Sequence, residues 1–150
     1  MKELSEKLLT VIESAEPNLR KISASESAKQ ILPGGWSRKQ VLGHLIDSAS
    51  NNHQRFVRAV QADSLDFPAY DQEGNVRVQA PQDADWGPLV SLWATYNRYL
   101  AHVIARLPAA KLETICRIGT GKPTTLGYIA TDYLRHLVHH LEQIGAAEAA

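Results

Sequence analysis

Two histidines near the C-terminal end of the chain, His136 and His140, are four residues apart. On an α-helix this spacing places two imidazole rings on one face, one turn apart. Two neutral imidazoles held in this way can share a divalent metal ion if a third ligand comes from elsewhere. His139 lies between them, so three of the chain's six histidines fall in this short segment, which is therefore the first place to look for chemistry.

A third histidine, His44, lies in a second helical pattern, on a narrow polar arc beside the apolar residue Val41. At about 100° per residue the members of this arc are Ser37, Gln40, His44, Ser48, Asn51 and Arg55. His136 and His140 lie on a similar arc with Asp132 and Gln143. If the two arcs face each other, the three histidines converge at the rim of the core. Three neutral nitrogens with open positions for water are typical of a catalytic metal site.

The alternative is that both polar arcs face water, as the polar side of an amphipathic helix normally does. A pair of histidines at this spacing also arises by chance on helix surfaces. The same seam between polar and apolar residues on two separate helices favours the metal site over this alternative.

A three-histidine centre can support two kinds of reaction. The metal can lower the pKa of a bound water from about 16 towards 7, which yields hydroxide for hydrolysis. It can also hold a thiolate against an electrophile, which yields thiol transfer. Imidazole binds several first-row metals. The ligands therefore predict one divalent ion but do not decide whether it is Zn, Ni, Fe or Mn.

Other polar residues of the two helices are candidates for the surroundings of the metal. Asp132, Asp47 and Gln143 can orient the ligand rings, and Gln143 is the strongest of them because it shares the histidine arc. Asn51 and Arg55 continue the His44 arc and can line a pocket for a polar or anionic substrate. The alternative for each is an ordinary solvated side chain. No catalytic acid or base can be assigned from the sequence.

Apolar residues recur at helical spacing over most of the chain and predict four helices. Ser37 and Gln40 form a capping box at the start of the second helix. Pro17 is expected to bend or split the first helix, and Gly145 is expected to stop the fourth. The predicted ranges are about 3–23, 38–62, 85–107 and 125–144.

The connections between these helices are unusually long, and such loops are often functional. We expect residues 63–84 to form a loop in which Tyr70 is a hydrophobic anchor, and Trp36 to be a structural plug at the start of the second helix. Residues 111–122 alternate weakly, at Ile115, Arg117 and Ile118, and are predicted to be extended and to pair with residues 75–78 in a small two-stranded piece. The predicted architecture is all-α, a four-helix bundle with long crossover loops, in one domain spanning residues 1–150.

Composition narrows the classes of function. The formal net charge is +0, whereas a nucleic-acid-binding protein usually has a basic excess. No apolar stretch approaches the roughly 20 residues needed to cross a bilayer, and the first residues lack the apolar run of a signal peptide. Cys116 is the single cysteine, so a reducing compartment fits. We expect a cytoplasmic protein that binds neither nucleic acid nor a membrane.

Two segments carry a resemblance to a known family. Residues 36–45 (WSRKQVLGHL) resemble the second-helix signature of the DinB-like (YfiT-like) superfamily, and residues 136–144 (HLVHHLEQI) resemble its fourth-helix signature. The order and separation of the two signatures also fit, so the resemblance covers essentially the whole chain. Many members have Arg-Gly where this chain has Leu141 and Glu142, which leaves subfamily and substrate open.

The resemblance implies a four-helix bundle with one divalent metal ion bound by His44, His136 and His140, whereas His139 is not the usual ligand. It implies a metal-dependent hydrolase acting on an unidentified small molecule, or a metal-dependent transferase of low-molecular-weight thiols. A helical interaction module without catalysis is the third hypothesis. Paired apolar helices with exposed aromatic residues favour a homodimer under all three hypotheses.

Overall fold

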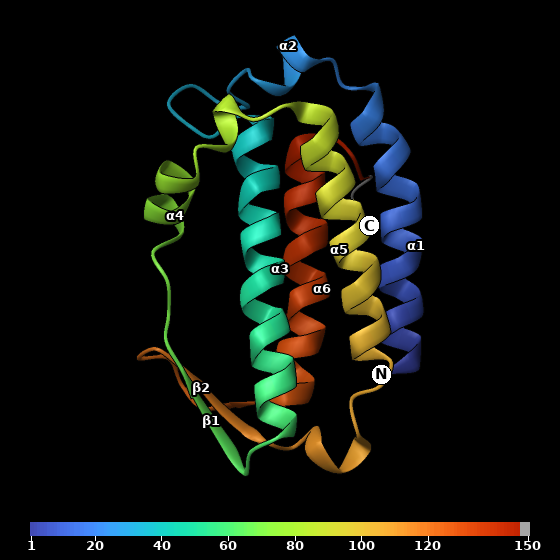
Figure 1. Ribbon diagram of the computed structural model, residues 1–150, viewed down its shortest axis with the longest axis vertical. Coiled ribbons are helices and arrows are strands. Elements are labelled where there is room, and N and C mark those ends of the chain that lie inside the picture. The colour runs from blue at the N-terminus through green and yellow to red at the C-terminus, as the bar shows by residue number, and fades with distance from the viewer. Residues whose placement is uncertain (148–150) are drawn as a thin grey trace.

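A computed structural model describes residues 1–147 and has four long helices side by side (Figure 1). The helices are α1 (Lys2–Lys21), α3 (Arg38–Val60), α5 (Trp86–Ile104) and α6 (Leu126–Ile144). The all-α prediction is confirmed, with helix ends close to those predicted. Pro17 does not split the first helix, since α1 continues through this residue. Within the described residues, no helix is long and apolar enough to span a bilayer.

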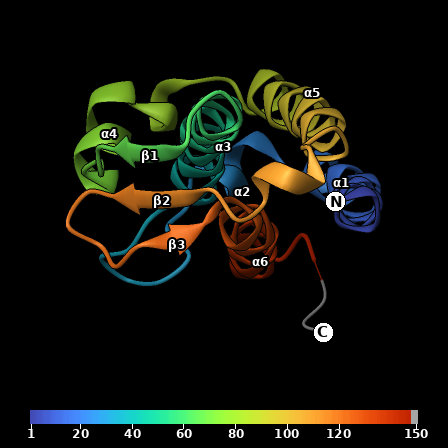
Figure 2. The same ribbon diagram turned by 90° about the horizontal axis from the view of Figure 1, so that it is seen from below.

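The four helices do not simply alternate in direction. α1 and α6 run towards one end of the bundle, and α3 and α5 run towards the other (Figure 1). Seen along the bundle, α5 packs between α1 and α3, and α6 lies against α3 and α1 (Figure 2). Because α3 and α5 are parallel, the chain between them must return along the whole length of the bundle.

This return segment, which we call the crossover (residues 61–85), is partly regular rather than the loop expected from the sequence. It contains β1 (Ser64–Phe67), α4 (Gln72–Gln79) and the 3₁₀ turn η1 (Pro81–Asp83), and it passes outside α3 (Figure 1). A Cβ atom on Gly43 would lie 2.6 Å from Pro81 Cβ, so the glycine allows η1 to approach α3 directly beside His44.

A small sheet closes the end of the bundle where α6 begins. β1 pairs in parallel with β2 (Ile115–Ile118), and β2 pairs antiparallel with β3 (Thr124–Thr125) (Figure 2). The extended conformation of residues 115–118 is confirmed, but their predicted pairing with residues 75–78 is wrong. Those residues belong to α4, where Asp71 caps the helix by accepting from Gly74 N–H and Val76 is the one buried side chain.

The ends of α3 and α6 are fixed by local residues. In the capping box of α3, Ser37 Oγ accepts from Gln40 N–H while Gln40 Oε1 accepts from Ser37 N–H. Thr125 caps α6, and Gly145 ends it with a left-handed φ of 80°. Two short helices, α2 (Ala24–Ser27) and η2 (Ala109–Lys111), lie in the remaining connections.

Candidate metal centre

His44 faces the interior from the second turn of α3. Its side chain is 0 % exposed, although histidine carries two polar ring nitrogens. Besides its capping box, α3 is tied to the crossover at this end, because Ser37 Oγ donates to Gln82 Oε1 at 2.5 Å. The cap and the tie fix the axial position and rotation of α3, and therefore the direction of the His44 ring.

α6 carries the other two rings towards His44. His136 and His140 are half-buried one turn apart, with ring centroids 4.5 Å apart. His44 lies edge-on to both, with centroid distances of 5.1 Å to His136 and 4.8 Å to His140. The two polar seams predicted from the sequence therefore do face each other across the antiparallel pair of helices.

The three rings point the same nitrogen at one another. His136 Nε2 lies 3.2 Å from His44 Nε2 and 3.1 Å from His140 Nε2. The potential ligand atoms of the three residues all lie within 4.8 Å of one another. A nitrogen lone pair cannot bond to another lone pair, so this convergence is unfavourable unless protons or a cation lie between the nitrogens.

Electrostatics oppose protonation of this cluster. Burial, followed by the charge that His140 would carry, lowers the pKa of His44 to about 4. Burial and the other two histidines lower the pKa of His136 to about 4, and burial lowers the pKa of His140 as well. The rings are thus neutral near pH 7, which is the state in which imidazole binds metals.

The donor set and its spacing fit a divalent ion. Two nitrogens that are each about 2.0–2.1 Å from one zinc ion in tetrahedral geometry lie about 3.3 Å apart. The two Nε2 distances of 3.1 and 3.2 Å are close to this value. Three imidazoles, with no fourth histidine, cysteine or carboxylate beside them in residues 1–147, match the open coordination of catalytic rather than structural sites.

Comparison with known proteins agrees with this arrangement. A family model described as the DinB superfamily matches residues 2–144. The chain belongs to the DinB superfamily. Among solved structures, it is similar to YfiT from Bacillus subtilis, with a TM-score of 0.82 and 22% sequence identity over 97% of this chain and 86% of that chain. YfiT is described as a probable metal-dependent hydrolase with an unusual four-helix bundle topology. No curated protein matched the chain.

In this DinB-superfamily chain, Gln143 orients the ring of His140, as the sequence indicated. His140 Nδ1–H donates to Gln143 Oε1 at 2.8 Å, and Gln143 Nε2 donates to His139 Nε2 at 3.1 Å. A proton on His140 Nδ1 leaves Nε2 with its lone pair free towards the other rings. His44 Nδ1 is different, since it is buried and finds no hydrogen-bond partner within the described residues.

The two carboxylates proposed as ring partners contact other groups. Asp132 Oδ1 accepts from Arg135 Nε at 2.8 Å and from Arg135 Nη2 at 2.6 Å. Asp47 is buried, and its carboxylate accepts from Asn75 at 2.9 Å and from Asn51 at 3.3 Å. Asp47 thereby holds α4 of the crossover against α3, and Asn51 supports that contact.

A cleft of about 220 Å³ leads from the histidines towards the sheet. It runs between α3, α6 and the crossover, and His136 lies in its wall together with Asp132 and Tyr133. Its other polar walls come from Ser48, Asn52, Tyr70, Lys122, Thr124 and Tyr128. A second hollow of about 380 Å³ borders His140 and Gln143 on the opposite side and is mostly apolar.

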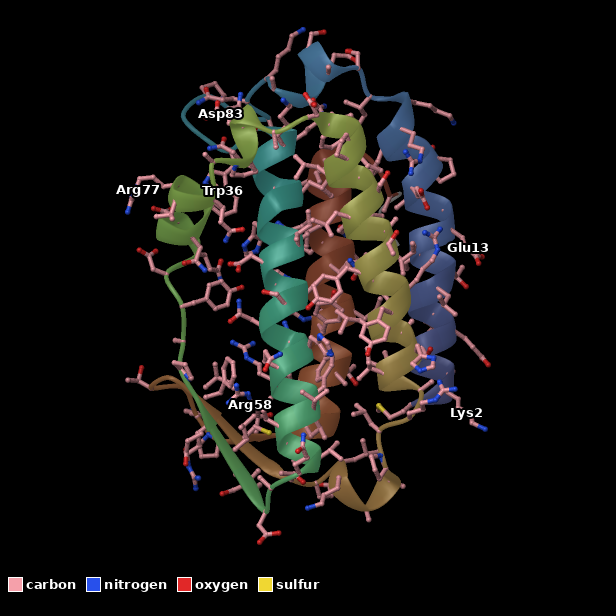
Figure 3. The ribbon with its side chains drawn as sticks, viewed as in Figure 1. Lys2, Glu13, Trp36, Arg58, Arg77 and Asp83 are labelled. Atoms are coloured by element: carbon pink, nitrogen blue, oxygen red, sulfur yellow. The ribbon has the colours of Figure 1, made fainter. Side chains whose placement is uncertain are left out.

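Two residues near the histidines were given only structural roles in the sequence analysis. Tyr70 was interpreted as a loop anchor, yet it lines the cleft, where burial and the charge of Asp47 raise its pKa. Trp36 is not only a plug, since its ring lies 5.3 Å from that of His44 (Figure 3). The pattern of Asp71 before Glu73 could have revealed α4 as a capped helix, and with it the proximity of the crossover to α3.

Proposed function

We propose that this protein is a metal-dependent hydrolase that acts on a small molecule, with one divalent ion held by His44, His136 and His140. The observation that carries the proposal is the convergence of three neutral imidazole Nε2 atoms, with spacings of 3.1 and 3.2 Å, at the head of a cleft. The description of YfiT as a probable metal-dependent hydrolase supports it.

A divalent ion in such a site supplies Lewis-acid chemistry, because it lowers the pKa of bound water towards 7. The protein's own residues supply position and protons. Gln143 fixes the tautomer of His140. Trp36 and the crossover cover His44, and the raised pKa of Tyr70 keeps its hydroxyl protonated near pH 7. The Tyr70 O–H is therefore available to donate a hydrogen bond to a substrate oxygen in the cleft.

Activity screening tests this proposal. Protein purified without a polyhistidine tag would be loaded with Zn, Ni, Fe(II) or Mn and assayed against chromogenic esters, amides and lactones. We expect hydrolysis that needs the metal, is lost in His44→Ala and is kept in His53→Ala, which removes a histidine of α3 outside the cluster. Hydrolysis that is unaffected by chelation, or absent with every metal, would contradict the proposal.

The same assay separates the competing reaction. A parallel series would add a low-molecular-weight thiol and 1-chloro-2,4-dinitrobenzene as the electrophile. If the electrophile is consumed only with thiol and metal together, the centre performs thiol transfer instead of hydrolysis. If neither reaction depends on the metal, the third hypothesis of a non-catalytic helical module replaces both.

A further inference from the structure

The cleft beside His136 has an uneven distribution of charge. Its one carboxylate, Asp132, is already bound by Arg135. Its remaining polar lining consists of hydroxyl and amide groups and of Lys122, an exposed residue in the turn between β2 and β3. Within the described residues, Lys122 forms no ion pair with an acidic side chain. The cleft therefore carries an excess of positive charge.

A second cation, Arg55, is not among the residues that line the cleft, but it donates to Asn52, which is. Its guanidinium group is half-buried and lies 5.4 Å from the centre of the Phe67 ring. Its one hydrogen bond to another side chain is a long one, 3.4 Å from Nη1 to Asn52 Oδ1. Arg55 Nε is buried and has no partner within the described residues. Asn52, which accepts from Arg55, lines the cleft.

A half-buried guanidinium without a counter-ion is unfavourable, because it loses hydration and gains no opposite charge. Neighbouring arginines of this protein do not share that property. Arg58, one turn further along α3, is exposed and donates to Gln54 Oε1 at 3.1 Å (Figure 3). Arg135 binds Asp132. Arg55 is thus placed for a bound anion rather than for an internal partner.

We propose that the cleft binds an anionic group of the substrate at the end lined by Lys122 and Asn52, next to the Arg55 guanidinium, while the reacting bond lies at the three histidines. The proposal rests on the metal-dependent function above and names its substrate class, a small molecule with a carboxylate or phosphate at one end. Guanidinium groups form charge-assisted, bidentate hydrogen bonds with both kinds of anion.

The spacing of the residues sets the shape of such a substrate. Arg55 follows His44 by about three turns of α3, on the order of 16 Å along the helix axis. Because the Arg55 and Lys122 side chains are long and flexible, an anion that they bind can lie closer to the histidines than this axial distance. An anion at their end is separated from the reacting group by a spacer of several atoms, so substrates with adjacent groups are too short.

Matched pairs of metal-binding probes test the proposal. One series consists of the monohydroxamates of succinic, adipic and suberic acids, in which the hydroxamate binds the metal and the free carboxylate reaches along the cleft. Each probe has an uncharged partner in which the carboxylate is a primary amide, and a phosphonate series replaces carboxylate by phosphonate. Dissociation constants would be measured by calorimetry with zinc-loaded protein of known metal content.

We expect a charged probe of one chain length to bind about tenfold or more tightly than its amide partner. That preference should disappear in Arg55→Gln and weaken in Lys122→Gln, with the amide probe unaffected. Arg58→Gln is the matched control and should keep the preference. Arg55→Lys keeps the charge without the planar donor pair and should keep part of it, which guards against loss of folding in Arg55→Gln.

Equal affinity for the charged and amide probes would overturn the proposal, as would a preference that survives both substitutions. Failure of both probes to bind the metal-loaded protein would overturn it too. Failure of the metal-dependent function has a separate signature, namely that the wild-type protein takes up no metal. The carboxylate and phosphonate series rank the two anions by their dissociation constants.

Discussion

Two parallel helices of the same bundle, α5 and α3, bury very different side chains. α5 buries seven apolar residues and one polar residue, Asn97. Asn97 has partners there, since its Nδ2 donates to Trp93 O at 2.8 Å and its Oδ1 accepts from the Tyr133 hydroxyl. α3 buries four polar residues, His44, Asp47, Ser48 and Asn52. Each of the two helices also has a buried ring N–H or ring nitrogen without a partner within the described residues, Trp93 Nε1 in α5 and His44 Nδ1 in α3.

This difference indicates that α5 serves mainly the stability of the core, whereas α3 also serves the candidate metal centre. Burying polar groups costs stability unless each finds a partner, so a helix that served only the core would resemble α5. α3 instead carries its buried polar side chains on the side that faces α6 and the crossover, where the histidines and the cleft lie. We therefore expect substitutions in α5 to affect folding and substitutions around α3 to affect metal binding.

The largest effect should come from the core face of α5. Leu100 is 0 % exposed, and Leu100→Ala should lower the free energy of unfolding by about 2–5 kcal/mol, because it leaves a cavity. The metal content of the folded protein should stay unchanged. Urea denaturation and metal analysis check both halves. A Leu100→Ala variant that folds normally but loses metal would contradict the expectation that α5 affects folding and not metal binding.

The free energy of unfolding of the metal-free protein should depend on pH, because the folded chain holds the buried histidines neutral. The pKa of His44 is about 4 in the folded chain against an ordinary 6.5. As the pH falls from about 6.5 to 4, His44 becomes protonated in the unfolded chain but stays neutral in the folded chain. The free energy of unfolding should therefore fall through this window, by on the order of 3 kcal/mol for His44 alone.

Denaturation of chelator-treated protein between pH 4 and 8 measures this slope. His44→Gln should reduce the slope without abolishing it, because the pKa values of His136 and His140 are also lowered, whereas His102→Gln, at an exposed position on α5, should leave the curve as in the wild type. A curve that is flat from pH 6.5 to 4 in the wild type would mean that the three imidazoles are not held neutral.

Gln143→Ala should weaken metal binding without removing it. The variant loses the acceptor for His140 Nδ1–H, and loss of such an orienting group typically costs about 10–100-fold in metal affinity. Competition with a chromogenic chelator measures the change, with Glu142→Ala as the control on the neighbouring residue. Unchanged affinity in Gln143→Ala would show that the ring is oriented by packing alone.

The smallest effect should come from the contact between the crossover and α3. Asn75→Ala removes the hydrogen bond to Asp47 Oδ2 and should cost about 1–2 kcal/mol, because the acceptor is a buried charge. Limited proteolysis should cut the crossover faster in this variant. Gln79→Ala, at an exposed position of the same helix α4, serves as the control. Equal cleavage rates would show that Asp47 does not hold the crossover.

The four long helices and the histidine cluster could be predicted because their signals are local. The Ser37 and Gln40 side chains mark the start of α3, and Gly145 marks the end of α6. The boundary between polar and apolar residues on which His44 lies can be predicted from the helical spacing of the residues in α3. Once two such seams exist, burial of the apolar faces brings them together.

The crossover could not be predicted in the same way, since its structure depends on what it packs against. α4 has only Val76 to bury, so its helical period is hidden, and its position depends on Asn75 reaching Asp47. The cleft combines α3, α6, the crossover and the turn around Lys122. Such a combination of distant segments leaves no periodic signal in the sequence.

Metal content tests the central claim most directly. Protein purified without a polyhistidine tag would be incubated with Zn, Ni, Mn and Fe(II), desalted and measured by ICP mass spectrometry, together with His44→Ala and His140→Ala. His53→Ala and His139→Ala are the matched controls on the same two helices. The account predicts about one ion per chain in the wild type and both controls, and loss of it from both folded ligand variants. A wild-type protein that retains none of these metals would contradict the account.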